Sequence, residues 1–228
     1  MEQRLRHEQV KGVNLVIPDK HWTLIERELV RVAFKAVPTK KTQPIHMYYR
    51  RLFYYLVMVL AVTGMRPQEA THLIKWKDFS LKKKDPKKQD QFVSACVIDL
   101  INPDGKGSRK IVSHAGQMIQ QFRKYANNWR QENGFHSIKP TDLIFAYPRT
   151  NDAYPYSQLG LTFRQTLSHI GLAGKGYTLR SLRATYITEQ LSKGVSPYLL
   201  SKNTGHSIEV MKKHYEDLGI EDIADALL

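Results

Sequence analysis

The fold is decided by residues 177–215, which carry the sequence YTLRSLRATYITEQLSKGVSPYLLSKNTGHSIEVMKKHY. Two arginines, Arg180 and Arg183, lie near the start of this stretch. A turn formed by Thr204-Gly205-His206 follows, and Tyr215 comes nine residues after the histidine. Guanidinium groups pair well with phosphate oxygens, and a tyrosine hydroxyl can serve as a nucleophile. The stretch therefore indicates a site that binds and attacks a phosphodiester.

A second segment, residues 63–69 with the sequence TGMRPQE, adds Arg66 to this set. Pro67 is typical of the first position of a helix, so Arg66 is expected at a helix start. A cation is poorly placed there unless it has an anionic partner, because the helix dipole is positive at that end. We therefore expect Arg66 to bind a phosphate, and a solvent-facing arginine is the alternative.

The composition favours a nucleic acid as the partner. The 228 residues include 35 Lys and Arg against 21 Asp and Glu, which gives a formal net charge of +14. An excess of this size favours an anionic polymer. The positive charge is spread along the chain and is not gathered on one amphipathic helix, which argues against a protein of the membrane surface.

The cysteine content and hydropathy point to an intracellular protein. The single cysteine, Cys96, excludes an internal disulfide framework, and its apolar surroundings predict a buried side chain. No secretory signal is visible, and the most apolar run, 56–63, is too short to cross a bilayer. We therefore expect no membrane partner.

Helical patterns dominate the sequence. The pattern Thr23-x-x-Glu26 is typical of a capping box, so the first helix is expected to begin at Thr23 and residues 1–22 to form an arm or linker. Gly64 is expected to end a long apolar helix. Further expected helices cover about 48–62, 117–132, 159–170, 181–193, 198–203, 208–215 and 220–228.

A short β-region interrupts the helices. Residues 92–101 and 109–112 are rich in strand-forming side chains, and the turn cluster at 102–107 joins them into a hairpin or small sheet. The lysine-rich segment 82–88 contains a proline and is expected to be an exposed turn, either simply solvated or in contact with DNA. The predicted fold class is mainly α with a small antiparallel β-sheet.

In motif order and spacing, the chain resembles the catalytic domain of the tyrosine recombinases, the phage integrase family, over residues 23–215. The first family motif, Thr-Gly-hydrophobic-Arg-x-x-Glu, matches residues 63–69, and a Trp-x-Asp element follows at 74–78. The resemblance implies that Arg66 is the first catalytic arginine. It also implies that His206 contacts the phosphate and that Tyr215 is the nucleophile.

The second family motif fits in two registers. The distances to Gly194 and His206 favour Arg183 as its catalytic arginine over Arg180. Arg180 then stands where the family usually has histidine or lysine, although Tyr177 could also fill that place. An arginine can hold a phosphate oxygen, but it cannot shuttle protons. A plain surface cation is the alternative role for Arg180.

The family also places a lysine on its β-hairpin. Lys106, in the turn before the second strand, is the best match, and Arg109 or Lys110 is the alternative. Burial and nearby cations can lower a lysine pKa, which suits a general acid. Since Arg180 cannot exchange protons, Lys106 is the leading candidate to protonate the leaving 5′ oxygen.

The resemblance implies a site-specific DNA recombinase or integrase of a phage or other mobile element, working through a 3′-phosphotyrosine intermediate. The alternatives are an inactive DNA-binding regulator and a type IB topoisomerase-like nicking and resealing enzyme. No cofactor and no metal are expected. The expected partner is double-stranded DNA, bound by a homotetramer on paired sites and by a protein that is monomeric alone. We further expect a cytoplasmic, nucleoid-associated protein of a bacterial host.

The ends of the chain complete these expectations. The family normally has an N-terminal domain that clamps the DNA, so the chain is expected to be a catalytic domain cut from a longer protein, and an unusually small recombinase is the alternative. The tail helix within 216–228 is expected either to contact a neighbouring subunit or to fold back on its own domain.

Overall fold

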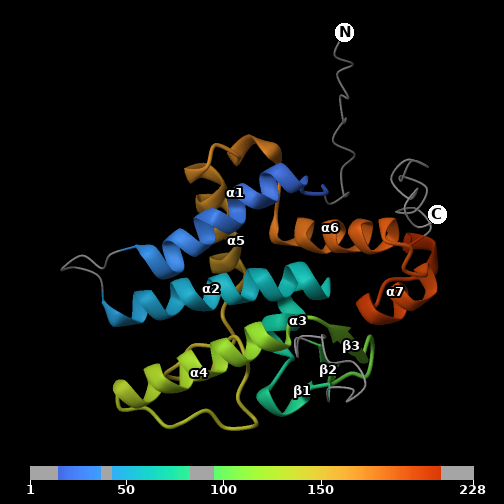
Figure 1. The fold of residues 1–228 in the computed structure, drawn as a ribbon. Coiled ribbons are helices and arrows are strands. Elements are labelled where there is room, and N and C mark those ends of the chain that lie inside the picture. The colour runs from blue at the N-terminus through green and yellow to red at the C-terminus, as the bar shows by residue number, and fades with distance from the viewer. Residues whose placement is uncertain (1–14, 37–42, 83–94, 212–228) are drawn as a thin grey trace, which may run out of the picture.

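A computed structural model describes residues 15–36, 43–82 and 95–211 (Figure 1). These residues form a mainly helical molecule with one small antiparallel sheet, which confirms the expected fold class. The α-helices are α1 (Asp19–Val30), α2 (Pro44–Thr63), α3 (Pro67–His72), α4 (Gly116–Glu132), α5 (Tyr156–His169), α6 (Leu179–Ser192) and α7 (Pro197–Thr204). Shorter helical turns are η1 (Arg31–Lys35), η2 (Trp76–Asp78) and η3 (Ala173–Lys175).

Helix α2 is the centre of the core. Figure 1 shows it between α1 and α4, and it also packs against α6. Leu52, Leu56 and Leu60 are almost fully buried, and burying one such side chain contributes about 1.5–3 kcal/mol. The helix begins at Pro44, four residues before the expected start, because proline is well tolerated at the first helical position. Gly64 ends it, as the sequence predicts, with a φ of 62° that glycine adopts readily.

The predicted start of the first helix is wrong. Helix α1 begins at Asp19, four residues before Thr23, and so takes in the last residues of the arm expected over 1–22. Pro18 is extended just before the helix, and the Asp19 carboxylate lies in the first turn, where a negative charge is favourable. Thr23 is not a cap, because its hydroxyl donates to the Asp19 carbonyl inside the helix at 2.9 Å.

The sheet has three strands, β1 (Phe79–Leu81), β2 (Cys96–Leu100) and β3 (Arg109–Ser113), in the order β1-β2-β3 with both pairs antiparallel. Ile98 at its centre pairs with Phe79 on one side and Ile111 on the other. The expected hairpin is confirmed by β2 and β3, whereas β1 was not predicted. Cys96 is buried as expected, and burial raises its pKa to about 11, so its thiol is a poor nucleophile.

The four later helices begin one to three residues before their predicted starts. Helices α6 and α7, which belong to the stretch 177–215, form one end of the molecule. They share a small apolar cluster, separate from the main core, made of Tyr186, Ile187, Leu191, Leu200 and Met211.

Several predicted features lie outside the described residues. Residues 208–211 are helical, but the helix expected to continue to Tyr215 and the tail helix at 220–228 lie beyond residue 211. The greater part of the lysine-rich turn expected over 82–88 also lies outside the described residues.

Candidate functional site

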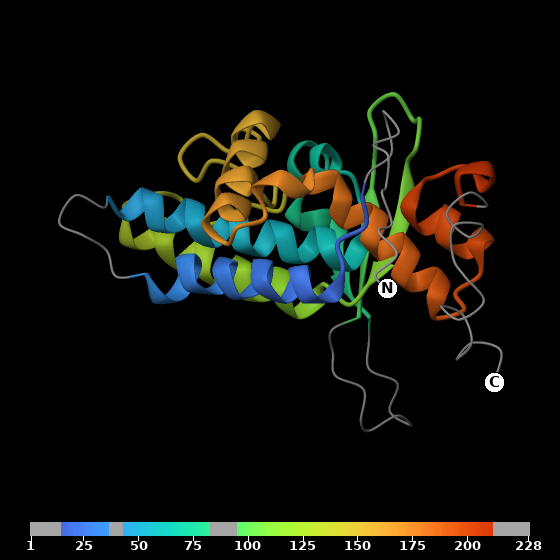
Figure 2. The same ribbon diagram turned by 90° about the horizontal axis from the view of Figure 1, so that it is seen from above.

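Segments that are distant in the sequence meet at one end of the molecule, where α6, α7 and β3 lie together (Figures 1 and 2). Arg66 lies at the start of α3 and reaches the turn after α7, since its Nη2 is 3.5 Å from the Gly205 carbonyl oxygen. Arg183 on α6 reaches the same turn through His206. The structure therefore brings together Arg66, Arg183 and His206, three of the predicted site residues.

Arg183 is buried, and its guanidinium group is only partly satisfied. Its Nη1 donates to the Gly64 carbonyl at 2.7 Å, and its Nε donates to His206 Nε2 at 3.2 Å. Its Nη2 is buried and has no hydrogen-bond partner among the described residues. Burial and the nearby Arg66 charge lower the Arg183 pKa to about 9, which leaves the group charged at neutral pH. An anion that reached Nη2 would relieve the cost of this buried charge.

Arg66 has the anionic partner that its position at a helix start requires. Its Nη1 contacts Glu69 Oε1 at 2.7 Å, and its backbone N–H donates to Glu69 Oε2 at 2.8 Å. The Arg66 side chain is nevertheless 48% exposed. It is therefore a cation that is fixed at one edge and open to a ligand at another.

Glu69 is shared between two arginines. Arg109, the first residue of β3, donates from Nη1 and Nη2 to the two carboxylate oxygens at 3.1 and 2.9 Å. Burial alone would raise the Glu69 pKa, but hydrogen bonds and charge from Arg109 and Arg66 outweigh it, so the pKa lies below its ordinary value. Glu69 therefore stays ionised in the cluster at neutral pH.

Comparisons with known proteins give the fold. Neither a family model nor a curated protein matches the sequence. Among solved structures, the XerH site-specific recombinase bound to difH substrate aligns with a TM-score of 0.63 at 18% identity, covering 96% of this chain and 55% of that chain. XerA recombinase aligns with a TM-score of 0.58 at 16% identity, covering 96% of this chain and 65% of that chain. The Tn1549 transposon integrase in complex with transposon right end DNA aligns with a TM-score of 0.58 at 13% identity, covering 96% of this chain and 66% of that chain.

These three proteins are tyrosine recombinases. The chain has the fold of a tyrosine recombinase catalytic domain. It spans about half the length of the XerH chain.

Within this tyrosine recombinase fold, Lys106 lies in the β2–β3 turn and is exposed. Its backbone N–H donates to Asp104 Oδ1 at 3.0 Å. A hollow of about 460 Å³ lies beside the turn, between the start of β3 and α7. Of the two alternatives to Lys106, Lys110 pairs with Asp99 at the surface at 2.7 Å, whereas Arg109 belongs to the cluster around Glu69.

Arg180 and Arg183 have different environments on α6. Arg180 is exposed, and its backbone N–H donates to the cap residue Thr178 at 3.2 Å. Tyr177, the other candidate for the histidine or lysine position of tyrosine recombinases, is buried, and its hydroxyl lies 2.7 Å from His21 Nδ1 on α1. The structure thus includes Arg183 in the cluster, while both candidates for the neighbouring position have contacts of other kinds.

The predicted nucleophile, Tyr215, lies outside the described residues, which end at Met211. Met211 is fully buried in the cluster shared by α6 and α7. The chain therefore leaves the described region from a fixed point five residues after His206. The role of Tyr215 stays a prediction.

The described residues show no sign of two other kinds of site. Within the described ranges, no group of three His, Cys, Asp or Glu side chains is arranged to hold a metal ion. In the same part of the chain, no helix is both long enough and apolar enough to cross a membrane.

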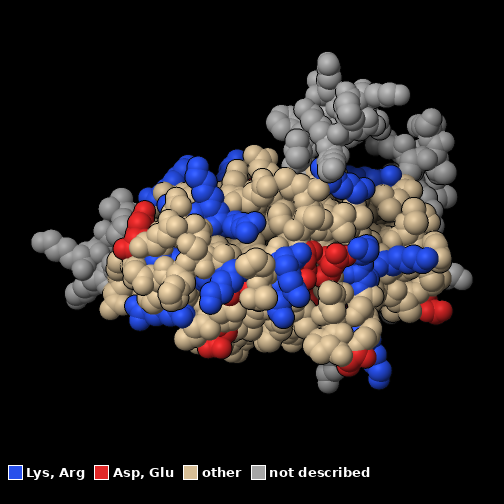
Figure 3. All heavy atoms as spheres, turned by 90° about the horizontal axis from the view of Figure 1, so that it is seen from below, with Lys and Arg blue, Asp and Glu red and all other residues tan. Residues whose placement is uncertain are grey.

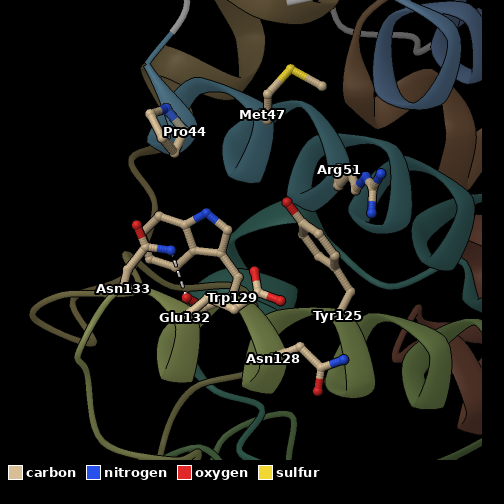
Figure 4. A pocket seen from close by; sticks show the side chains of 8 residues that line it. All are labelled: Pro44, Met47, Arg51, Tyr125, Asn128, Trp129, Glu132 and Asn133. Carbon is tan, nitrogen blue, oxygen red and sulfur yellow. Dashed lines mark hydrogen bonds between the residues drawn. The ribbon is translucent and has the colours of Figure 1, made fainter.

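A second hollow, of about 640 Å³, lies between the first half of α2 and the end of α4 (Figure 4). Arg51 stacks over the Tyr125 ring there at 4.4 Å, with Trp129 and Glu132 further along α4. Because α2 is about 30 Å long, this hollow is remote from Gly64 and the arginine cluster.

Proposed function

We propose that the protein cleaves and rejoins DNA strands through a 3′-phosphotyrosine intermediate formed by Tyr215. The observation that carries the proposal is the meeting of Arg66, Arg183 and His206 in a tyrosine recombinase fold. Arg183 has a buried donor without a partner among the described residues, and Arg66 is half exposed. Two fixed guanidinium groups with donors to spare suit the two non-bridging oxygens of one phosphodiester.

In the proposed reaction, Tyr215 Oη attacks the phosphorus and the bond from phosphorus to the 5′ oxygen breaks. The phenolic proton is released, and the 5′ oxygen takes up a proton for which Lys106 is the proposed donor. Arg66 and Arg183 stabilise the charge that builds on the non-bridging oxygens, with Arg180 as a proposed further contact. Attack by another 5′ hydroxyl reverses these steps and releases the tyrosine, so no external energy source is needed.

His206 is proposed to bind the same phosphate. Its Nε2 accepts the hydrogen bond from Arg183 Nε, so the proton of the neutral ring is assigned to Nδ1. The donor role toward an oxygen therefore falls to Nδ1. In this arrangement, the hydrogen bond from Arg183 Nε to His206 also fixes the orientation of the Arg183 guanidinium group.

Double-stranded DNA is the proposed partner. Lys and Arg side chains are scattered over the face of the molecule seen in Figure 3, with fewer acidic side chains among them. This charge fits a surface that contacts the phosphate backbone. We also propose action on paired sites, with a homotetramer on DNA and a monomer alone.

The test is covalent trapping on a nicked duplex whose scissile 5′ oxygen is replaced by sulfur. This substitution prevents rejoining, so cleavage accumulates as a protein–DNA adduct on a denaturing gel. The duplex is drawn from the DNA that flanks the gene. We expect an adduct with the full chain and none with Tyr215→Phe, because the phenylalanine lacks the attacking oxygen.

Other outcomes separate the alternative functions. Binding without any adduct would contradict the proposal and support an inactive DNA-binding regulator. An adduct together with plasmid relaxation, but without joining of two duplexes, would support a topoisomerase-like enzyme. An adduct that survives in Tyr215→Phe would assign the attack to another residue.

A further inference from the structure

Arg109 is the most completely bound arginine of the cluster. Besides its two bonds to Glu69, its Nε donates to the Asn203 carbonyl at 3.0 Å and its Nη1 to the Gly107 carbonyl at 3.0 Å. Its side chain is only 8% exposed. Each of its three guanidinium nitrogens thus has a protein acceptor.

This pattern differs from that of the arginines proposed to bind phosphate. Arg183 keeps Nη2 without a partner among the described residues, and Arg66 is half exposed. A ligand that bound those two groups would not have to break a protein hydrogen bond. Four of the five N–H donors of Arg109 are already used, so a ligand at its Nε or Nη1 would have to displace Glu69 or a backbone carbonyl. Arg109 therefore acts on other residues of the site and not on a ligand.

The contacts of Arg109 join three elements. Glu69 belongs to α3, Asn203 to α7, and Arg109 itself to β3. The backbone of the turn after α7 packs directly on the Arg109 guanidinium group, since a Cβ placed on Gly205 would lie 2.9 Å from Arg109 Nη1. Gly205 is also the residue whose carbonyl faces Arg66 and which precedes His206.

We propose that Arg109 is a positioning residue, which keeps the Glu69 carboxylate aimed at Arg66 and holds the turn that carries His206 against β3. As a positioning role for the cleavage site, it rests on the proposed function. Without Arg109, the burial of Glu69 would be opposed by Arg66 alone, and the carboxyl group would take up a proton more readily. Arg66 would then lose the anion that fixes it.

The first test compares Arg109→Gln with Arg130→Gln in the full chain. Arg130 forms a matching buried ion pair with Asp142 at 2.6 Å, from side chains 8% and 12% exposed, against 8% and 11% for Arg109 and Glu69. Both changes therefore break a buried pair, but only the first touches the cluster. At saturating suicide duplex, we expect the rate of adduct formation to fall roughly 10- to 100-fold in Arg109→Gln, with unchanged DNA affinity, because misplaced groups slow the reaction by such factors. We expect the Arg130→Gln rate to stay near that of the parent.

The pH profile supplies a measurement that loss of packing alone would not move. We expect the acid limb of the pH–rate profile for adduct formation to shift to higher pH in Arg109→Gln, because Glu69 then takes up a proton at a higher pH. The other groups facing Glu69 are Arg66 and Arg183, with His206 beyond Arg183, and all are present in both variants. Arg109→Lys restores a charge but not the paired hydrogen bonds to Glu69. We therefore expect its pH profile to lie between those of the parent and Arg109→Gln. Equal rates and profiles in Arg109→Gln and Arg130→Gln would overturn the proposal.

A third measurement does not need catalysis, so it separates this proposal from the proposed function. A carboxyl group whose folded pKa is lowered adds stability above its unfolded pKa, near 4.5, and this stability is lost as pH falls through the folded pKa. We therefore expect the Tm difference between the parent and Arg109→Gln to be largest at pH 7 and to narrow below about pH 4.5. A difference that stays constant with pH would refute the link between Arg109 and Glu69, even if no adduct ever formed. If the Tm difference narrows at low pH but no adduct ever forms, the link between Arg109 and Glu69 stands and only the proposed function is refuted.

Discussion

Arg183 shows how burial makes one charged side chain into a receptor for an anion. Its charge is repelled by Arg66 and Arg109, and a single carboxylate, Glu69, opposes the three. The cluster therefore keeps an excess of positive charge in a place where water screens it poorly. A phosphodiester, with one negative charge, would offset half of this excess.

The two candidate registers of the second motif predict different single substitutions. We expect Arg183→Lys to lower the rate of adduct formation about 100-fold or more, because one ammonium group cannot reach the Gly64 carbonyl, His206 and a phosphate together. The exposed Arg180→Lys serves as the control, and we expect a far smaller loss. The reverse order of the two rates would place Arg180 in the catalytic position.

At the scale of elements, the junction of α2 and α3 connects the core to the site. Gly64 ends α2 with positive φ, offers its carbonyl to Arg183, and lies against the ring of Tyr186. A Cβ at this position would lie 2.3 Å from Tyr186 Cδ1. Backbone geometry, core packing and the placement of Arg183 thus depend on the absence of one side chain.

Substitution of this glycine gives a stability prediction. We expect Gly64→Ala to lower the free energy of unfolding by about 2–5 kcal/mol, which combines left-handed strain of about 1–2 kcal/mol with overpacking against Tyr186 of about 1–3 kcal/mol. Gly105→Ala is the matched control, since Gly105 has a φ of 74° and nothing within 4 Å of an added Cβ. It should cost only the strain. Equal losses in urea denaturation of the two variants would contradict the packing contribution.

Local signals in the sequence predicted most elements, and the failures have non-local causes. Gly64 and Pro67 mark a helix end and a helix start by their own backbone preferences, and both marks are correct. The residues before α1 are fixed by a distant partner, since the Ile17 N–H donates to Thr185 Oγ1 at 2.8 Å. Strand β1 has only three residues and exists through its pairing with β2, so its own sequence gave little indication of it.

The candidate site was predictable to the extent that motifs preserve spacing. Arg66, Arg183 and His206 were each expected from short motifs, and the structure brings them together. Arg109 was only an alternative to Lys106, because its partners Glu69 and Asn203 are 40 and 94 residues away in the chain. One signal was present in the sequence, since Arg109 at an expected strand start and Glu69 in the first motif carry complementary charges.

At the scale of the whole molecule, the net charge of +14 predicts how DNA binding responds to salt. Each phosphate that the protein neutralises releases condensed counterions, so affinity falls with salt concentration. For about six phosphate contacts, we expect the affinity for a generic duplex to fall about 10³-fold between roughly 50 and 200 mM salt. Fluorescence anisotropy of a labelled duplex measures this. An affinity that does not change with salt would contradict a binding mode dominated by the phosphate backbone.

The Asn203 side chain has a consequence for the behaviour of the hairpin in solution. Its Oδ1 accepts the Val112 N–H at 2.8 Å and its Nδ2 donates to the Val112 carbonyl at 3.3 Å. The Asn203 side-chain amide thus pairs with the free edge of β3 as a neighbouring strand would. An unpaired edge of this kind can pair with strands of other molecules and lead to aggregation. The Asn203 amide covers this part of the edge, so a foreign strand cannot pair with β3 at Val112 unless the amide is displaced.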